Sequence, residues 1–246
     1  MSKSSSGTKL LQFSVHPERL ELHMIKAIIF DMDGLMIDSE RCTYEAYVKE
    51  CARYGYKMDL EYYKSLIGYN MGIIRTRLSS HFGKDFPLET VIQNVFDDLR
   101  DRFETEGVPL KKGLLRLLEY AKCKGYKIVA ATSSDRNRVD HILKLADIAA
   151  YFDASVCGNE IKNSKPDPEI FLMACEKVAV KPEETLVLED SEWGILAAFN
   201  AGIRCICIPD MKQPQKQFSE KTAAVLESLE QVIPFLDKDA RESKRL

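Results

Sequence analysis

The residues with the clearest chemical potential in this 246-residue chain are Asp31 and Asp33, two aspartates separated by one residue. They lie in the segment Phe30-Asp-Met-Asp-Gly-Leu35, directly after a largely apolar run at residues 25–30. Such a run, stopped by an acidic residue and a glycine, is typical of a buried strand that ends in a tight loop. Ligands of open α/β sheets bind at that edge. Two carboxylates there repel each other unless a positive group lies between them, which points to a divalent metal and a phosphate ester.

The same segment also fits an ordinary turn, because Asp and Gly both favour turns. Three more polar segments favour the catalytic interpretation, since they accompany other strand-like runs. They are Thr132-Ser133-Ser134, Asn163-Ser164-Lys165-Pro166-Asp167-Pro168 and Glu189-Asp190-Ser191. The carboxyl ends of parallel strands meet at one edge of the sheet. The sequence therefore predicts that a hydroxyl, an ammonium group and a second acidic pair lie beside the two aspartates.

This combination of groups suits phosphoryl transfer. Asp31 can attack phosphorus to give an aspartyl-phosphate, and Asp33 can protonate the leaving oxygen and later activate water. Thr132 and Lys165 can bind the non-bridging oxygens on which charge develops. Mg²⁺, which prefers oxygen ligands, can neutralise charge between the nucleophile and the phosphate.

Each position taken alone also has an interpretation without catalysis. Thr132 fits a helix N-cap, and Lys165 fits a solvated loop lysine. Glu189 and Asp190 fit the first turn of a helix, where acidic residues complement the helix dipole. The ordered set of four segments is more specific than any one member, so the catalytic interpretation is our prediction.

The elements that must position these groups alternate between strands and helices. Further strand-like runs lie at residues 126–132, 154–157, 185–188 and 204–209. Apolar residues at helical spacing lie between or beside them, at residues 114–124, 137–145, 168–178 and 191–200. This alternation predicts an α/β fold in which a parallel sheet carries helices on both faces.

Residues 39–106 interrupt the alternation with a purely helical pattern. We expect helices at about residues 40–54, 60–66, 71–82 and 88–104, with no strand among them. The pattern predicts a helical cap domain at 39–106, inserted into a catalytic core domain formed by 24–38 and 107–246. Asp38-Ser39 and Gly107-Val108-Pro109 would be the hinges. Residues 1–23 are predicted to be a flexible N-terminal extension, and the polar tail after Pro234 is expected to fray.

Composition argues against several classes of function. The net charge is −3 and 45% of the residues are hydrophobic, so neither nucleic acid nor a membrane surface is an expected partner. No apolar stretch approaches the ~20 residues that span a bilayer, and the start of the chain shows no signal-peptide pattern. The seven cysteines and four histidines show no CxxC pair and no zinc spacing. This favours buried, reduced thiols in a cytoplasmic protein, with a monomer as the default expectation.

The four segments together resemble the haloacid dehalogenase superfamily, and within it the β-phosphoglucomutase-like group with a helical cap. The resemblance covers residues 24–210 and includes Asp38-Ser39-Glu40 and Gly194. It implies a Rossmann-like parallel-sheet core with an inserted all-helical cap domain. It also implies an enzyme that handles phosphate esters with Mg²⁺ as cofactor.

Carried over by position, the resemblance assigns roles to individual residues. Asp31 would be the nucleophile and a metal ligand, and Asp33 the general acid/base, with its backbone carbonyl also on the metal. Thr132 and Lys165 would hold the phosphoryl group. Asp190 would complete the metal site, with Glu189 beside it or acting through water. Weaker candidates for phosphate contact follow Thr132 in the chain: Ser133, Ser134 and Arg136.

Two features separate subclasses within the superfamily. The dehalogenases that name it lack the second aspartate and use no Mg²⁺, so Asp33 favours phosphate chemistry. The β-phosphoglucomutases carry a cap histidine that keeps water from discharging the aspartyl-phosphate, and Thr43 stands at that position here. Their phosphate-gripping cap arginine would fall near Met71, with Arg75 and Arg77 a turn or more later.

The expected activity is therefore hydrolysis of a small phosphorylated metabolite, such as a sugar phosphate, by a Mg²⁺-dependent phosphatase. A hexose-phosphate mutase is the alternative enzyme. A binding or regulatory module on a disused phosphatase fold would have lost a nucleophile, metal or lysine position, and none is lost.

Overall fold

A six-stranded parallel sheet forms the centre of the protein in a computed structural model that describes residues 24–242. The strand order is β3-β2-β1-β4-β5-β6, and every neighbouring pair is parallel. The strands are β1 (Ala27–Phe30), β2 (Lys127–Thr132), β3 (Ala154–Cys157), β4 (Thr185–Glu189), β5 (Arg204–Cys207) and β6 (Ala224–Val225). The predicted Rossmann-like core is confirmed. The extension predicted at residues 1–23 lies outside the described residues.

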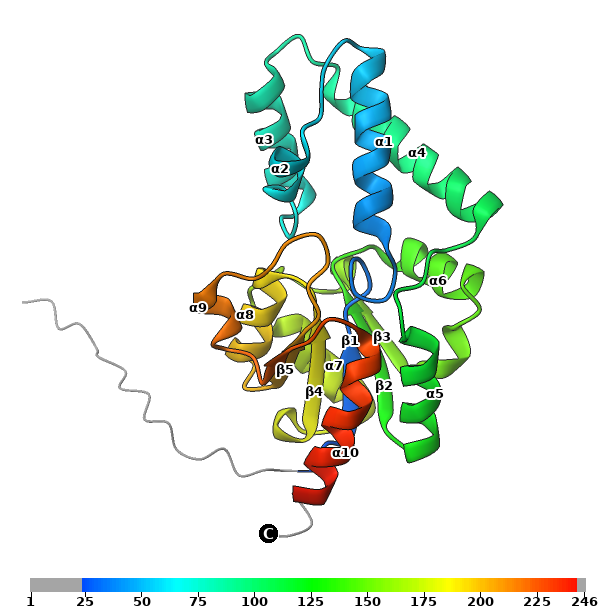
Figure 1. The fold of residues 1–246 in the computed structure, drawn as a ribbon, viewed down its shortest axis with the longest axis vertical. Coiled ribbons are helices and arrows are strands. Elements are labelled where there is room, and N and C mark those ends of the chain that lie inside the picture. The colour runs from blue at the N-terminus through cyan, green and yellow to red at the C-terminus, as the bar shows by residue number, and fades with distance from the viewer. Residues whose placement is uncertain (1–23, 243–246) are drawn as a thin grey trace, which may run out of the picture.

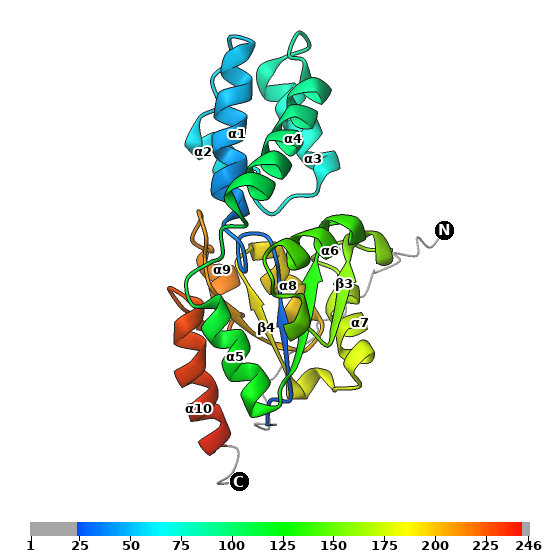
Figure 2. The same ribbon diagram turned by 90° about the vertical axis from the view of Figure 1, so that its right-hand side faces the viewer.

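Helices cover both faces of the sheet, as Figures 1 and 2 show. They are α5 (Leu114–Lys124), α6 (Arg136–Leu145), α7 (Glu169–Val178), α8 (Glu192–Asn200), α9 (Lys216–Ser219) and α10 (Val232–Glu242). Alternate residues of β1 enter different clusters, because successive side chains of a strand point to opposite faces. Ile28 and Phe30 pack with α5 and α10, whereas Ile29 packs with α7 and α8. The sheet is therefore buried on both sides.

The register of β1 with its two neighbours fixes where the polar segments meet. Phe30, the last residue of β1, stands beside Ala130 of β2 and Leu188 of β4. The Asp31 N–H donates to the Leu188 carbonyl at 3.0 Å, which extends the pairing by one residue. The residues that follow these three strands consequently emerge at one edge of the sheet.

A helical block stands above that edge and connects β1 to the rest of the core (Figures 1 and 2). It contains α1 (Ser39–Arg53), α2 (Leu60–Lys64), α3 (Met71–Phe82) and α4 (Leu88–Glu106). No strand occurs at residues 39–106, all of which are described. α4 buries Val91, Val95 and Leu99 on one face, a spacing that matches a helix packed on its neighbours.

The two chain segments that enter and leave the helical block are joined to each other. Ile37 and Leu110 form an antiparallel bridge. The Asp38 N–H donates to the Pro109 carbonyl at 2.8 Å, and the Lys111 N–H donates to the Met36 carbonyl at 2.9 Å. The predicted hinge residues therefore lie side by side. Across residues 24–242, no helix has the length and apolar character needed to cross a membrane.

The expectation that the chain frays after Pro234 is wrong. Residues 232–242 form α10, in which Leu236 is 1% exposed. Asp239, also buried, pairs with Arg204 of β5, and the Tyr120 hydroxyl donates to Asp237 at 2.7 Å. The high average polarity of this tail hid a narrow apolar stripe. Pro234 is tolerated because it lies in the first turn of the helix.

The cysteines follow the prediction with one exception. All seven are free thiols, and six are buried. Cys123, near the end of α5, is exposed. Only part of an amphipathic helix faces the core, and this position lies on its outer surface.

Leu236→Ala should lower the free energy of unfolding by about 2–4 kcal/mol, because it leaves a cavity under α10. Urea unfolding followed by circular dichroism would measure the change. Leu115→Ala is the matched control, since Leu115 is 46% exposed on α5 and should cost less than about 0.5 kcal/mol. Equal losses for the two variants would contradict the packing of α10.

Candidate active site

Asp31 and Asp33 lie in a tight loop that follows β1. The loop turns back on itself through hydrogen bonds from the Met36 and Ile37 N–H groups to the Met32 carbonyl, at 2.9 and 3.1 Å. Gly34 adopts φ +82°, and a Cβ built on it would lie 2.3 Å from Oδ2 of Asp190. A side chain at residue 34 would therefore exclude Asp190, so the glycine brings the loops after β1 and β4 together.

Lys165 places its ammonium group between two carboxylates from neighbouring strands. Its Nζ lies 2.5 Å from Oδ1 of Asp31 and 2.6 Å from Oε1 of Glu189. The Lys165 side chain is 7% exposed, so the solvated loop lysine is excluded. Burial alone would lower the pKa of Lys165, but Asp31 and Glu189 outweigh it and raise the pKa above its usual value. The ammonium group is consequently held charged beside the predicted nucleophile.

Glu189 is a buried support for this lysine. Its second oxygen accepts hydrogen bonds from the N–H groups of Asp190 and Ser191, both at 3.0 Å, and from the Ser191 hydroxyl at 2.9 Å. A Cβ at Gly194 would lie 1.9 Å from the Glu189 carboxylate, so only glycine leaves room for it there. With both oxygens engaged, Glu189 would have to give up these bonds to contact a metal directly.

Asp33 is held by a group that the sequence analysis did not single out. Arg138 of α6 donates two hydrogen bonds to its carboxylate, both at 2.8 Å, and the Ser134 hydroxyl donates a third at 2.8 Å. Burial alone would raise the pKa of Asp33, but Arg138 and Ser134 outweigh it and lower the pKa. Nothing local in the sequence marks this role of Arg138, because Asp33 lies 105 residues away along the chain.

Thr132 and Ser133 follow β2 at the same edge. Thr132 is 1% exposed, and its hydroxyl accepts a hydrogen bond from the Ser134 N–H at 3.1 Å. It therefore supports the loop rather than capping α6, which begins four residues later. Ser133 is exposed, and its side chain makes no hydrogen bond within the described chain.

The Asp190 carboxylate is buried without a compensating charge. Within residues 24–242 its side chain accepts no hydrogen bond and forms no ion pair. Burial raises its pKa well above the usual value, and Glu189 and Asp31 raise it further. Burial likewise raises the pKa of Asp31 to about 7, although Lys165 opposes the rise. Carboxylates crowded in this way fit a bound cation.

A divalent metal fits this donor set, although few protein side chains would bind it. The described part of the chain contains no cluster of three His, Cys, Asp or Glu side chains arranged as metal ligands. The predicted site uses fewer side chains, namely the carboxylates of Asp31 and Asp190 with the backbone carbonyl of Asp33. Mg²⁺ commonly binds through one or two carboxylates and completes its shell with water and substrate phosphate, so the donor set suits Mg²⁺.

Glu40, which the sequence analysis named in the segment Asp38-Ser39-Glu40 without giving it a role, is a further acidic residue of the site. It lies in the first turn of α1 and accepts a hydrogen bond from the Tyr63 hydroxyl at 2.7 Å. Burial raises the pKa of Glu40 to about 7, and the charge of Asp33 contributes. Tyr63 is distant in sequence, so only the fold reveals this pair.

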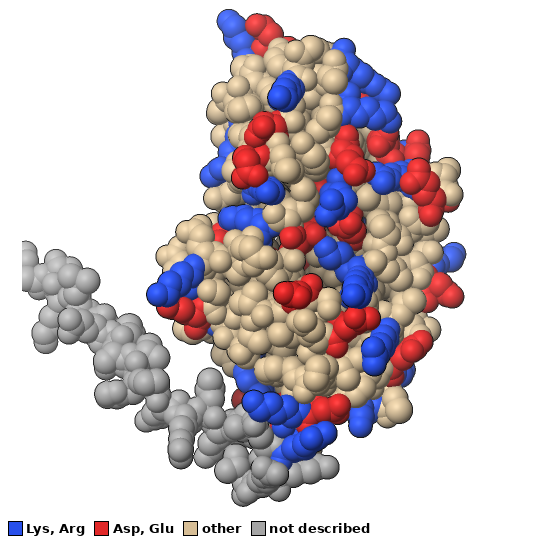
Figure 3. Space-filling view, in the orientation of Figure 1, with Lys and Arg blue, Asp and Glu red and all other residues tan. Residues whose placement is uncertain are grey.

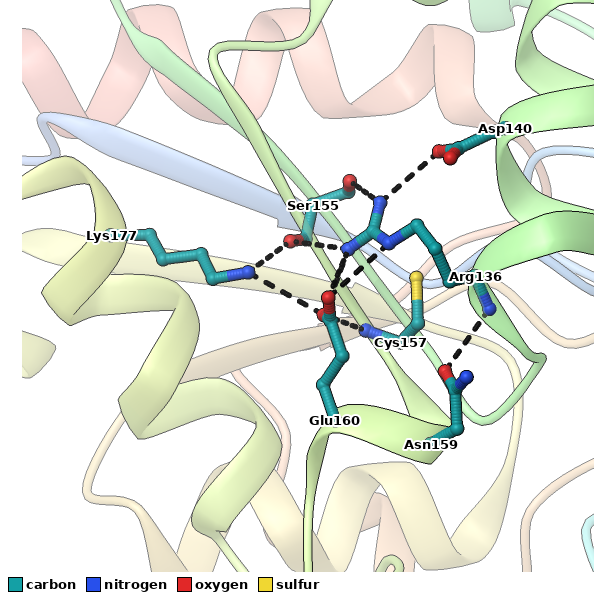
Figure 4. A network of polar contacts seen from close by, with 7 residues as sticks. All are labelled: Arg136, Asp140, Ser155, Cys157, Asn159, Glu160 and Lys177. Carbon is teal, nitrogen blue, oxygen red and sulfur yellow. Dashed lines mark hydrogen bonds and ion pairs between the residues drawn. The ribbon is translucent and has the colours of Figure 1, made fainter.

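Arg136 does not reach the site, which corrects its assignment as a weak phosphate contact. Its guanidinium binds Glu160 at 2.8 Å, the Ser155 hydroxyl at 2.5 Å and Asp140 at 3.2 Å (Figure 4). Lys177 joins the same network through the Ser155 carbonyl. The network ties α6 to β3 and to the turn that precedes the Lys165 loop. Sequence proximity to Thr132 was misleading because α6 turns this side chain outward.

The helical block carries the residues at which the sequence departs from the mutase pattern. The Thr43 hydroxyl donates to the Ser39 carbonyl at 2.8 Å, within its own helix. Arg75 binds Glu89 at 3.0 Å. Arg77 instead lines a cleft of about 490 Å³ between the α2–α3 segment and the loops after β4 and β5. Asp190 and Ser191 line the same cleft, so it opens onto the candidate site.

Comparison with known proteins agrees with this geometry. A Thermotoga maritima protein named phosphorylated carbohydrates phosphatase is 34% identical over 186 residues, which cover 74% of this chain and 84% of that protein. A Drosophila melanogaster protein named "Probable pseudouridine-5'-phosphatase" is 31% identical over 225 residues, covering 87% of this chain and 94% of that protein. The crystal structure of a β-phosphoglucomutase from Clostridium difficile shares the fold, with a TM-score of 0.69 at 23% identity and coverage of 91% of this chain and 100% of that one.

A family model matches most of the described chain. The family is described as haloacid dehalogenase-like hydrolase, and the match spans residues 28–208. These residues contain the loop after β1, the helical block, Lys165 and the acidic pair after β4. The resemblance predicted from the motifs is confirmed, and the chain belongs to the haloacid dehalogenase-like hydrolase family.

Proposed function

We propose that this protein is a Mg²⁺-dependent phosphatase that hydrolyses a small phosphomonoester, such as a sugar phosphate, through an aspartyl-phosphate. The observation that carries the proposal is the position of Lys165, whose ammonium group lies 2.5 Å from Asp31 and 2.6 Å from Glu189 at the carboxyl edge of the sheet. Lysine placed beside a buried carboxylate suits a site that must hold both a nucleophile and a phosphoryl group. The names of the relatives, which refer to phosphorylated carbohydrates and a nucleotide, support this substrate class.

In this proposal the residues of the site have separate roles. Asp31 attacks phosphorus, and Asp33 first protonates the leaving oxygen and then activates water. Lys165 and Thr132 hold the phosphoryl oxygens, with Ser133 and Ser134 nearby. Ser134 also donates to Asp33, so it helps to orient the acid/base. Lys165 is fixed by Glu189, which keeps its ammonium directed at Asp31.

The cofactor proposed is Mg²⁺, held by Asp31, Asp190 and the Asp33 carbonyl, with Glu189 next to it. When bound, it would neutralise the crowded carboxylates and draw charge from the phosphoryl oxygens. Asp190 supports this proposal because it is buried beside Glu189 and Asp31 without a cation of its own.

We also propose the domain roles predicted from the sequence: a cap at residues 39–106 over a catalytic core of 24–38 and 107–246. The cap would exclude bulk water and select the leaving group. Hydrolysis is favoured over the mutase alternative because Thr43 stands where the mutases carry their cap histidine, and Arg75 is engaged by Glu89. A cytoplasmic monomer that binds neither nucleic acid nor membrane remains the prediction.

Phosphate release from a panel of sugar phosphates, nucleotides and small phospho-acids, with Mg²⁺ and with chelator, tests the proposed function directly. Metal-dependent release from one class would support it. Isomer interconversion without release would instead identify a mutase.

Asp31→Asn should lower phosphate release by at least about 1000-fold, because it removes the attacking carboxylate. Asp135→Asn is the control, since Asp135 is exposed after Ser134 and its side chain does not cap α6. Steady-state phosphate release would measure both variants. Wild-type turnover in Asp31→Asn would refute the assignment of the nucleophile.

Asp190→Asn should abolish the stabilisation by Mg²⁺ without destabilising the metal-free protein. A carboxyl whose pKa is raised on folding destabilises the folded state at any pH above its unfolded pKa, so its removal is neutral or stabilising near pH 7. Wild-type protein should unfold at a higher temperature when Mg²⁺ is added, because the ion binds only the folded state. Thermal unfolding with Mg²⁺ and with chelator separates the two effects. An unchanged Mg²⁺ shift in the variant would exclude Asp190 as a ligand.

Arg138→Gln should move the acidic limb of the pH–rate profile to higher pH. Arg138 lowers the pKa of Asp33, so its loss lets burial raise that pKa, and ionised Asp33 then forms only at higher pH. Arg136→Gln is the matched control, since Arg136 lies in the separate network of Figure 4. A limb that shifts equally in both variants would show that Arg138 does not act through Asp33.

A further inference from the structure

The cleft between the helical block and the core is large enough to hold the leaving group of a substrate. Its volume of about 490 Å³ lies within the range of small-molecule sites, roughly 300–1,000 Å³. In Figure 1 the connection between β5 and α9 rises toward the α2–α3 end of the block, and both segments line the cleft. On the face shown in Figure 3, cationic and acidic side chains alternate along this junction.

Three aromatic rings in series line this cleft, and we call them the aromatic wall: Tyr69, Trp193 and Phe218. The ring centroids of Tyr69 and Trp193 are 5.9 Å apart, and those of Trp193 and Phe218 are 6.4 Å apart. All three side chains are partly exposed. The wall joins the helical block to the core, because Tyr69 precedes α3 whereas Trp193 and Phe218 lie in α8 and α9. Partly exposed rings of this kind offer apolar faces to a ligand.

Arg77 extends the wall as a cation that no carboxylate neutralises. Its guanidinium carbon lies 4.3 Å from the centroid of the Tyr69 ring, and Nη2 donates to the Tyr69 hydroxyl at 3.2 Å. Among residues 24–242, Arg77 forms no ion pair. The other cations of the lining pair with its acids: Lys64 with Glu61 and Lys212 with Glu192. A planar guanidinium stacked on a ring leaves its edge free to bind the polar atoms of a ligand.

The groups that remain available in the cleft favour one kind of leaving group. The carboxylates of the lining, which could otherwise accept hydrogen bonds from sugar hydroxyls, are already engaged. Glu61 and Glu192 pair with their lysine partners, and Asp210 pairs with Lys111. Asp190 is the proposed metal ligand. The available groups are the ring faces, the Arg77 edge and the amides of Gln215 and Gln217. Amides both donate and accept hydrogen bonds. A flat, unsaturated ring with polar atoms on its edge matches this set.

We infer that the substrate of this phosphatase carries a planar unsaturated ring that lies on the aromatic wall, as the base of a nucleoside 5′-monophosphate would. The inference rests on the proposed function and narrows its substrate class. The phosphoryl group would lie at Asp31, and the base would lie against Trp193 in the cleft. Trp193 and Tyr69 are thus specificity-determining residues. The base of the substrate would contact the helical block through Tyr69 and the core through Trp193.

The substrates that test this inference differ in whether a base is attached to the phosphorylated ribose. Uridine and adenosine 5′-monophosphate carry a base, and ribose 5-phosphate carries the same phosphorylated sugar without one. At least one nucleotide should exceed ribose 5-phosphate in kcat/KM by about 10- to 100-fold, the range expected for stacking of one base. Equal or higher kcat/KM for ribose 5-phosphate would overturn the aromatic wall as a selector and leave the phosphatase intact.

Trp193→Leu should reduce this ratio of kcat/KM values toward one, because the ring face is lost. Phe199→Leu is the matched control, since Phe199 is 48% exposed on the same helix and does not line the cleft. The control should keep the ratio of the wild-type protein, and circular dichroism should show both variants folded. An unchanged ratio in Trp193→Leu would refute the role of Trp193.

Direct binding gives a readout that does not depend on turnover. Trp193 is the sole tryptophan of the chain, so its fluorescence reports on the wall alone. In the Asp31→Asn protein a nucleoside 5′-monophosphate should quench this fluorescence saturably, after correction for absorption by the base, and ribose 5-phosphate should not. Quenching without hydrolysis of any ester by the wild-type protein would overturn the proposed function but keep the wall. Hydrolysis of nucleotides without quenching would overturn the wall but keep the phosphatase.

Discussion

The ion pairs of Lys165 hold the candidate active site together. Its ammonium group contacts Asp31 after β1 and Glu189 at the end of β4, which are neighbouring strands. Both carboxylates are buried, and losing one partner of a buried pair typically costs about 3–5 kcal/mol. The loop that supplies Lys165 is itself fixed, because Glu169 accepts hydrogen bonds from the Lys162 and Asn163 N–H groups at 2.9 Å. The position of Asp31, the proposed nucleophile, thus depends on a lysine from a third segment of the chain.

The pKa shifts of the carboxyls in the site depend on which cations lie beside them. Lys165 serves Asp31 and Glu189, and Arg138 serves Asp33. Within the described residues, no cation forms an ion pair with Asp190. The two aspartates of the first motif consequently differ, since the pKa of Asp31 is raised to about 7 and that of Asp33 is lowered. The opposite shifts reflect the different surroundings of the two carboxyls, since burial dominates at Asp31 and Arg138 outweighs burial at Asp33.

The sequence was sufficient for the sheet and for the convergence of its polar loops. Hydrophobic runs followed by polar residues identified β1, β2 and β4. The parallel register of these strands then places their polar ends at one edge of the sheet. Contacts between distant segments were not accessible, because nothing local marks them. Arg138 on Asp33 and Tyr63 on Glu40 are of this kind. α10 was missed because its buried stripe is narrow, and Arg136 was misassigned because its distance along the chain from Thr132 says little about direction.

An ion pair of Lys111 links the predicted hinge to the cleft, and so links the position of the helical block to the lining of the cleft. Lys111, which follows the second hinge, pairs with Asp38 at the first hinge and with Asp210 after β5. Asp210 begins the segment that lines the cleft and leads to Phe218. Tyr69, carried by the helical block, contacts Trp193 of the core. A rotation of the block about its hinges therefore changes the separation of Tyr69 and Trp193. In the proposed mechanism, closure over the phosphoryl site and contact with the leaving group would then be one motion, so a ligand that bridges these rings would also favour the state that excludes water.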